Sequence, residues 1–158
     1  MRLSPFTTHN SLLTTLLPLL LLSSLILHPS SLHSATPLLN LDNQATTLAQ
    51  HLQSPTTLIL IVTEQVDLPE AQRLLTLAVS QDQPALILIQ LPDSRLKAAA
   101  LRRAARPYFK SHYSQTHVYY LNASDHPHPT AKTLLLDPNH PTPIYQSTTY
   151  PPVLPKNK

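Results

Sequence analysis

The sequence contains no cysteine, no glycine and no tryptophan. Without cysteine the chain cannot form disulfides, and both thiol chemistry and zinc–thiolate sites are excluded. Without glycine it cannot build the phosphate-binding loops of nucleotide-binding proteins, in which the backbone must approach the phosphate closely. The codons of all three residues carry G at the second position, so their joint absence indicates a skewed base composition in the gene.

Charge is almost missing from residues 1–36, where Arg2 is the only charged side chain. Residues 12–27 are an apolar run interrupted only by threonine, serine and proline. This run is shorter than the ~20 residues that a membrane-spanning helix needs, and it is typical of a secretory signal. We therefore expect residues 1–36 to be a signal peptide or an N-terminal membrane anchor. The protein would then be secreted or periplasmic, and only this segment would contact a membrane.

The rest of the chain, about 120 residues, is enough for one domain. Residues 37–56 are polar and are predicted to be a linker or an edge helix, with a short helix over residues 41–53. Residues 57–149 are predicted to be an α/β domain. Residues 150–158 are rich in proline and are expected to form a loose, extended tail.

The apolar pattern of the domain begins with residues 57–63, a continuous run that is typical of a strand buried on both faces. Asp67, Pro69 and Glu70 then predict a helix that starts with an N-cap and a capping box. Residues 85–91 are a second apolar run. A strand, a helix and a strand at this spacing predict a right-handed parallel crossover.

A second helix and further strands follow this crossover. The expected elements are a helix over residues 95–106, ended or kinked by Pro107, and strands over residues 117–121, 131–137 and 143–149. The order β-α-β-α-β-β predicts a three-layer α/β sandwich with a mixed or mostly parallel sheet of four to five strands. Ligands of such sheets bind at the carboxyl ends of the strands, which here are residues 63–67, 91–94 and 122–130.

The helix over residues 95–106 has two different faces at 100° per residue. Leucine and alanine gather on one face, and arginine gathers on the other. The stripe of Arg95, Arg102 and Arg106 predicts a surface that binds phosphate or nucleic acid, because most affinity for polyanions comes from lysine and arginine. The alternative is an ordinary solvated face, which a charged helical stripe usually is.

Nine histidines are present, and His126 and His128 alternate with prolines in one segment. Side chains spaced in this way on an extended segment are able to bind a metal together with a carboxylate. Histidine is frequent along the whole chain, however, so the alternative is that its presence there reflects composition. The favoured expectation is no metal site and no cofactor.

The segment with Thr130, Lys132 and Asp137 resembles the His-x-Lys-x4-Asp motif of the phospholipase D-like phosphodiesterases and nucleases. Ser147 falls near the serine of the turn that follows this motif in the family. The resemblance covers about residues 57–149. It implies that Lys132 binds phosphoryl oxygens, that Asp137 supports the nucleophile, and that single-motif members form their site across a homodimer.

Thr130 stands where this family has its nucleophilic histidine. His128 lies two residues earlier on the same strand face, but it would be displaced by nearly 7 Å at ~3.3 Å per residue. The candidate catalytic residues are therefore Lys132, Asp137, His128 and Ser147, and whether the protein is an enzyme stays open. The resemblance implies an exported, degenerate domain that binds or weakly hydrolyses phosphodiesters or nucleic acid. The alternative is a non-catalytic envelope or secretion-machinery component that binds another protein.

Overall fold

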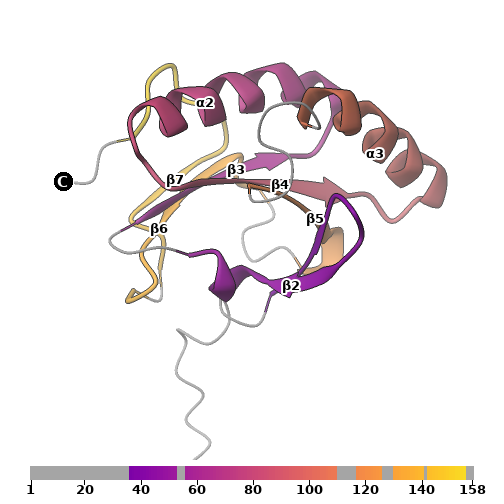
Figure 1. Ribbon diagram of the computed structural model, residues 1–158, viewed down its shortest axis with the longest axis horizontal. Helices are drawn as coiled ribbons and strands as arrows, with labels where there is room; N and C mark the ends of the chain where they lie inside the picture. Colours follow the sequence, from indigo (N-terminus) through magenta and orange to yellow (C-terminus); the bar gives the residue numbers. More distant parts are fainter. Residues whose placement is uncertain (1–35, 53–55, 110–116, 126–129, 141, 156–158) are drawn as a thin grey trace, which may run out of the picture.

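The computed structural model describes residues 36–52, 56–109, 117–125, 130–140 and 142–155, and these contain one mixed sheet and two α-helices (Figure 1). The protein is therefore α/β, as predicted, but its sheet has seven strands instead of four or five. The apolar leader lies outside the described residues. In the described part of the chain, no helix is long and apolar enough to cross a membrane. The elements in chain order are β1 (Pro37–Asn40), β2 (Ala45–Thr47), η1 (Leu48–Gln50), β3 (Thr57–Val62), η2 (Gln65–Asp67), α2 (Leu68–Ser80), β4 (Ala85–Leu91), α3 (Arg95–Phe109), β5 (Val118–Asn122), η3 (Ala123–Asp125), β6 (Thr133–Leu136) and β7 (Tyr145–Ser147).

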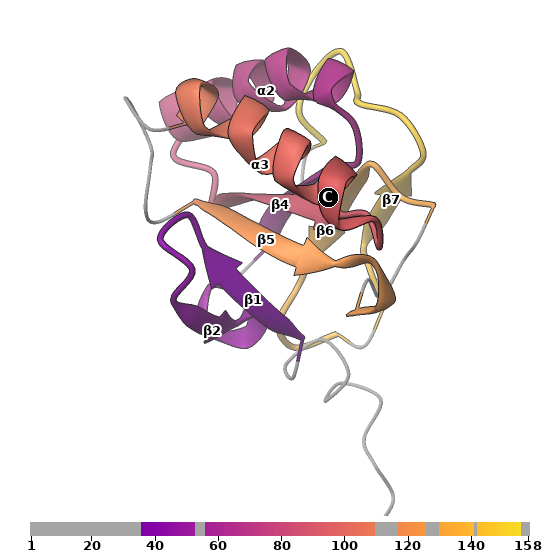
Figure 2. The ribbon, with the colours of Figure 1, turned by 90° about the vertical axis from the view of Figure 1, so that its right-hand side faces the viewer.

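The strands lie in the order β2-β1-β5-β4-β3-β6-β7, in which β3, β4 and β5 are parallel and the other neighbours are antiparallel. The crossovers from β3 to β4 and from β4 to β5 move in the same direction across the sheet. Both helices therefore lie on one face (Figures 1 and 2). Helices cover the second face only where the strand order reverses between crossovers. For this reason the described residues do not form the three-layer sandwich that the sequence predicted.

The prediction of a helix over residues 41–53 is wrong. The chain there forms the hairpin of β1 and β2 and the short turn η1 instead. Asn43 has a φ of 63° in the turn of this hairpin, a left-handed conformation that asparagine tolerates better than most residues. The side chain of Asn40 accepts hydrogen bonds from the backbone nitrogens of Asp42 and Gln44, at 2.9 and 2.8 Å. Strands this short show no alternation that a sequence pattern can reveal.

The core has a cluster on each face of the sheet, and β3 contributes to both. All six residues of β3 are fully buried. Leu58, Leu60 and Val62 pack under the helices, whereas Ile59 and Ile61 belong to the cluster on the opposite face. Full burial of each such aliphatic side chain contributes roughly 1.5–3 kcal/mol. The prediction of a strand buried on both faces is confirmed.

Two segments are more ordered than the sequence indicated. Helix α3 continues past Pro107 to Phe109, which is completely buried. Residues 150–155, predicted to be part of a loose tail, pack on the domain: the Tyr150 hydroxyl donates to the Ile61 carbonyl at 2.5 Å, and Leu154 is only 7% exposed in the helix-side cluster. Burial of Phe109 and Leu154 explains why each of these two segments packs on the domain.

We expect the change Tyr150→Phe to lower the free energy of unfolding by about 1 kcal/mol, because it removes the hydrogen bond to Ile61 and leaves a buried carbonyl without that donor. Urea denaturation of the full chain measures the change. Val153→Ala is the matched control, since Val153 is 69% exposed, and it should leave the stability unchanged. Equal stability of the Tyr150→Phe variant and the unmodified protein would show that this segment does not dock in solution.

Candidate functional site

Lys132 and Asp137 lie at opposite ends of strand β6. This strand is antiparallel to β3, with Thr133 opposite Leu60 and Leu136 opposite Thr57. Lys132 is therefore at the carboxyl end of β3, and Asp137 is at its amino end. The two residues are five positions apart, so their backbones are about 16 Å apart in extended chain at ~3.3 Å per residue. The two side chains cannot act on one phosphoryl group.

The ammonium group of Lys132 has partners of its own after the end of β3. It donates to the Thr63 hydroxyl at 2.6 Å and forms an ion pair with Oδ2 of Asp67. The same carboxylate accepts hydrogen bonds from the backbone nitrogens of Thr63 and Glu64, both at 3.0 Å. The sequence predicted that the Asp67 side chain caps α2, and this prediction is wrong. This side chain closes the loop before that helix in a reciprocal box with Glu64.

Burial raises the pKa of Asp67, but the hydrogen bonds from Lys132 and from the backbone of Thr63 and Glu64 outweigh it and bring the pKa below its ordinary value. Tyr150 lies beside this pair, with its ring centroid 5.9 Å from the Lys132 nitrogen. Burial, followed by the negative charges of Asp67 and Glu70, raises the pKa of Tyr150. All these groups are mutually satisfied, so the cluster fixes the loop in place and leaves no free nucleophile.

The remaining residues of the predicted catalytic set do not join Lys132. The Ser147 backbone oxygen accepts a hydrogen bond from the backbone nitrogen of Lys132 at 2.8 Å, but the Ser147 hydroxyl is hydrogen-bonded to Thr149. Asp137 accepts from the Asn139 nitrogen at 2.8 Å and lies 3.7 Å from His140. Both His126 and His128 lie outside the described residues. Across the described ranges, no group of three or more histidine, aspartate or glutamate side chains is placed to hold a metal ion.

The predicted rim at the carboxyl ends of the strands is only partly formed. Thr63 to Gln65 and Pro92 border a cavity of about 370 Å³ beneath the first turns of α3. Its two charged side chains, Glu64 and Lys97, are of opposite sign. None of the described residues of the third predicted segment, 122–125 and 130, lines this cavity, and Asn122 donates to Asp125 in η3. This cavity has no excess of either charge.

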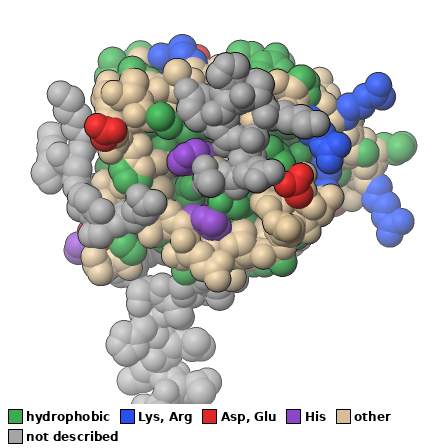
Figure 3. All heavy atoms as spheres, in the orientation of Figure 1, with side chains coloured by type: hydrophobic (Ala, Val, Ile, Leu, Met, Phe, Trp, Pro, Cys, Tyr) green, Lys and Arg blue, Asp and Glu red, His purple; other side chains and the backbone are tan. Residues whose placement is uncertain are grey.

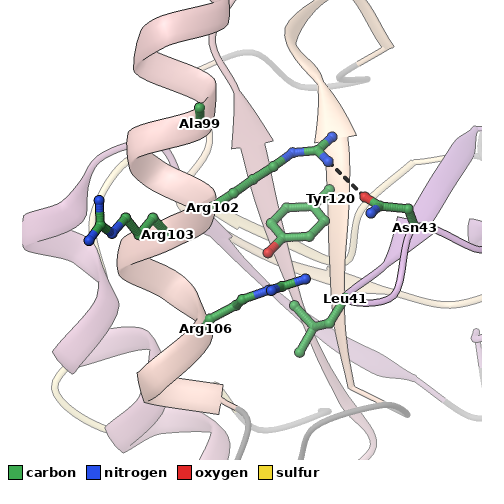
Figure 4. A pocket seen from close by; sticks show the side chains of 7 residues that line it. All are labelled: Leu41, Asn43, Ala99, Arg102, Arg103, Arg106 and Tyr120. Carbon is green, nitrogen blue, oxygen red and sulfur yellow. Dashed lines mark hydrogen bonds between the residues drawn. The ribbon is translucent and has the colours of Figure 1, made fainter.

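The arginine stripe of α3 borders a more specific site. Lysine and arginine side chains gather over this helix at one end of the molecule (Figure 3). Arg102 and Arg106 line a cavity of about 320 Å³ between α3, β5 and the β1–β2 turn, but Arg95 does not. We call this cavity the arginine pocket. Its lining consists of Leu41, Asn43, Ala99, Arg102, Arg103, Arg106 and Tyr120 (Figure 4).

Tyr120 lies between the side chains of Arg102 and Arg106, whereas Arg103 points away (Figure 4). The Arg102 guanidinium carbon is 4.7 Å from the centre of the Tyr120 ring, within the range of a cation–π contact. Its Nη1 atom donates to Oδ1 of Asn43 at 2.7 Å. Two arginines four positions apart on a helix repel each other. This arrangement therefore holds two positive charges at one cavity, and the contacts with Tyr120 and Asn43 fix the Arg102 guanidinium before any ligand binds.

The Tyr120 hydroxyl is the least satisfied polar group of the pocket. Tyr120 is only 2% exposed, and no described residue forms a hydrogen bond with its hydroxyl. Gln90 Oε1 is the one buried side-chain atom of the described residues without a hydrogen-bond partner, so the Tyr120 hydroxyl is not sealed from solvent and is open to the pocket. Burial raises the pKa of Tyr120, although the charges of Arg102 and Arg106 oppose this increase. The group therefore remains protonated and can donate to an acceptor in the pocket.

The sequence did not reveal Tyr120 and Asn43 as site residues. Adjacent residues of a strand point to opposite faces, and the sequence alone does not say which of Tyr119 and Tyr120 faces the arginines. The pairing of β1 with β5, with Leu39 opposite Tyr120, brings the turn with Asn43 to the pocket. The only available signal was two tyrosines in one strand close to an arginine-rich helix.

Tyr119 takes part in a different cluster that superficially resembles a catalytic triad. The Thr46 hydroxyl donates to Gln50 at 2.6 Å and so accepts from Nε2 of His51 at 2.9 Å, while Nδ1 of that ring accepts from Tyr119 at 3.0 Å. In this tautomer Nε2 carries its proton and cannot act as a base toward Thr46. Burial lowers the pKa of His51 and keeps the ring neutral. The cluster anchors η1 to the sheet.

No protein-family model matches the chain, and none of the curated proteins is significantly similar to it in sequence. Among solved structures, the mitochondrial 2-Cys peroxiredoxin from Plasmodium falciparum is similar with a TM-score of 0.44 and 12% identity. The similarity covers 72% of this chain and 79% of that chain. A likeness this distant carries no functional argument, and the present chain has no cysteine at all.

The prediction of a phospholipase D-like protein is wrong. The contacts of Lys132 overturn it, because this side chain pairs with Asp67 of a different segment and lies at the opposite end of β6 from Asp137. The hydrolase and nuclease functions that followed from the resemblance fail with it.

We expect the stability of the protein to fall in acid through Asp67. A carboxyl whose pKa is lower in the folded than in the unfolded state contributes stability above its unfolded pKa, and this contribution is lost as the pH falls through its folded pKa. Urea denaturation between pH 7 and pH 3 should show this loss below about pH 5. Asp67→Asn should reduce stability at pH 7 by about 2 kcal/mol and flatten the profile.

Asp93→Asn is the control for this series, because Asp93 is exposed before α3. It should leave the stability at pH 7 unchanged. An unchanged slope in Asp67→Asn would contradict the role assigned to the Lys132–Asp67 pair.

Proposed function

We propose that the protein binds a small anionic ligand and that the arginine pocket holds the oxyanion of this ligand. The observation that supports this most directly is Tyr120, a buried residue whose unpartnered hydroxyl lies between two arginine side chains (Figure 4). A phosphate or sulfate oxygen at this position would accept from the hydroxyl and from both guanidinium groups. Hydrogen bonds of this charge-assisted kind are the strong ones in proteins.

The charge of the pocket favours the same ligand. Three arginines line it, and none of the described lining residues is acidic or a histidine. Asp42 lies between the lining residues Leu41 and Asn43 in the sequence, and counting its charge against those of the three arginines still leaves an excess of two positive charges. An anion that enters would relieve the repulsion between Arg102 and Arg106. Leu41 and Ala99 give the cavity an apolar wall against which a small organic group can pack.

The size of the cavity favours a compact ligand over a long polyanion. The pocket of about 320 Å³ is at the lower end of the range for small-molecule sites. Arg95 belongs to the same stripe but lies outside the pocket, so it is not needed for a compact ligand. A nucleic acid that runs along α3 would instead use all three arginines of the stripe.

Other expectations from the sequence are proposals of the same kind. We propose that the protein is exported, because of the apolar segment at residues 12–27. A homodimer and a protein partner likewise stay predictions.

We expect inorganic sulfate to bind the full-length chain and to raise its melting temperature, because a ligand stabilises the state that binds it. Isothermal titration at low ionic strength measures the affinity. Arg106→Gln should weaken binding by about tenfold or more, since it removes a charge-assisted hydrogen bond worth roughly 1.5–3 kcal/mol. Arg102→Gln should act in the same direction.

Arg95→Gln is the matched control, because it removes the same charge from the same helix but from outside the pocket. It should leave the affinity for sulfate within about twofold. If all three variants weaken binding equally, the anion is held by the general field of the helix. If sulfate does not bind at all, the proposed function is wrong.

A further inference from the structure

Within the proposed function, the chemistry of the arginine pocket also restricts which anion it accepts. The polar groups that it presents are almost all hydrogen-bond donors. The guanidinium groups of Arg102 and Arg106 have no acceptor atom, and one of the two lone pairs of the Asn43 oxygen already accepts from Arg102 at 2.7 Å. A ligand oxygen that carries a proton would find no described lining side chain that acts as a base.

Two effects therefore weaken the binding of a protonated ligand in this pocket. Its hydroxyl group has few side-chain acceptors there, namely the Tyr120 oxygen and the second lone pair of the Asn43 oxygen, and its charge neutralises only one of two arginines. A buried donor without a partner costs about 1–3 kcal/mol. A fully ionised headgroup with two negative charges avoids both penalties, because all its oxygens accept and its charge matches Arg102 and Arg106.

We infer that the arginine pocket selects a dianion, namely the headgroup of a phosphomonoester or inorganic sulfate, and discriminates against singly charged phosphodiesters. This inference rests on the proposed function and gives it a substrate class. A phosphodiester has one charge for two arginines and two substituents on phosphorus, of which a cavity of about 320 Å³ bordered by α3, β5 and the β1–β2 turn holds one more readily than two (Figure 4). The body of the ligand would lie against Leu41 and Ala99.

The pH dependence of binding follows from the ligand and not from the pocket. The charged and titratable groups near the headgroup are Arg102, Arg103 and Arg106 of α3, the Tyr120 hydroxyl of β5, and Asp42 of the β1–β2 turn. Histidine is the one side chain whose ordinary pKa lies between pH 5 and pH 8, and none of the described residues that line the pocket is a histidine. A phosphomonoester, by contrast, loses its second proton with a pKa of about 6.

The test compares three probes on the full-length chain by isothermal titration at constant ionic strength: phenyl phosphate, dimethyl phosphate and inorganic sulfate. Affinity for phenyl phosphate should fall about tenfold from pH 7.5 to pH 5.0, in proportion to the fraction of dianion. Affinity for sulfate, which stays doubly charged over this range, should be constant. Dimethyl phosphate should bind at least about tenfold more weakly than phenyl phosphate at pH 7.5.

Tyr120→Phe is the variant for this site, because it removes only the hydroxyl and keeps the ring under Arg102. It should weaken sulfate and phenyl phosphate alike at pH 7.5, by about tenfold, while Tyr119→Phe on the other face should not. Circular dichroism of both variants verifies that the sheet is retained.

Three outcomes would overturn the inference and leave anion binding intact. These are an affinity for phenyl phosphate that does not change with pH, an affinity for dimethyl phosphate equal to that for phenyl phosphate, and a loss of sulfate affinity in acid that parallels the loss for phenyl phosphate. The absence of sulfate binding would instead overturn the proposed function itself.

Discussion

Strand β3 has no exposed side chain, and the rest of the molecule is arranged to cover it on both faces. On one face the cover is α2 and α3, which the two crossovers of the same direction place side by side (Figure 2). On the other face, Leu38 of β1 and Leu48 of η1 pack against the cluster that contains Ile59 and Ile61. The hairpin of β1 and β2 forms one edge of the same sheet, and its turn borders the arginine pocket opposite α3.

The Lys132–Asp67 pair and the arginines of the pocket lie at different parts of the sheet. Lys132 and Asp67 meet at the carboxyl end of β3, where each satisfies the other and the loop before α2 becomes rigid. The arginines of α3 lie over β5, where the described part of the chain supplies no carboxylate within hydrogen-bond distance of Arg102 or Arg106. A charge that has a partner inside the fold stabilises the fold, whereas a charge held without one is available to a ligand. This difference separates a structural ion pair from a binding site here.

The Lys132 motif shows why a short spacing pattern is a weak guide to chemistry. A lysine and an aspartate five residues apart lie at opposite ends of a four-residue strand when that strand is fully extended. The partner that decides the role of Lys132 is instead Asp67, 65 positions away in the sequence. The motif spacing predicted that Lys132 acts in phosphodiester hydrolysis, but the contacts of Lys132 do not support this reaction.

The sequence by itself determined the elements whose pattern is long or strongly apolar: β3, α2, β4, α3 and the buried strands β5 and β6. It also determined the basic face of α3, because helical periodicity is local. Tertiary structure decided what depends on contacts between distant segments, namely the pairing of β1 with β5, the docking of Tyr150, and which tyrosine of β5 faces Arg102. Short strands carry almost no local signal, and the face that a strand residue occupies is fixed by its neighbours in space and not by its neighbours in sequence.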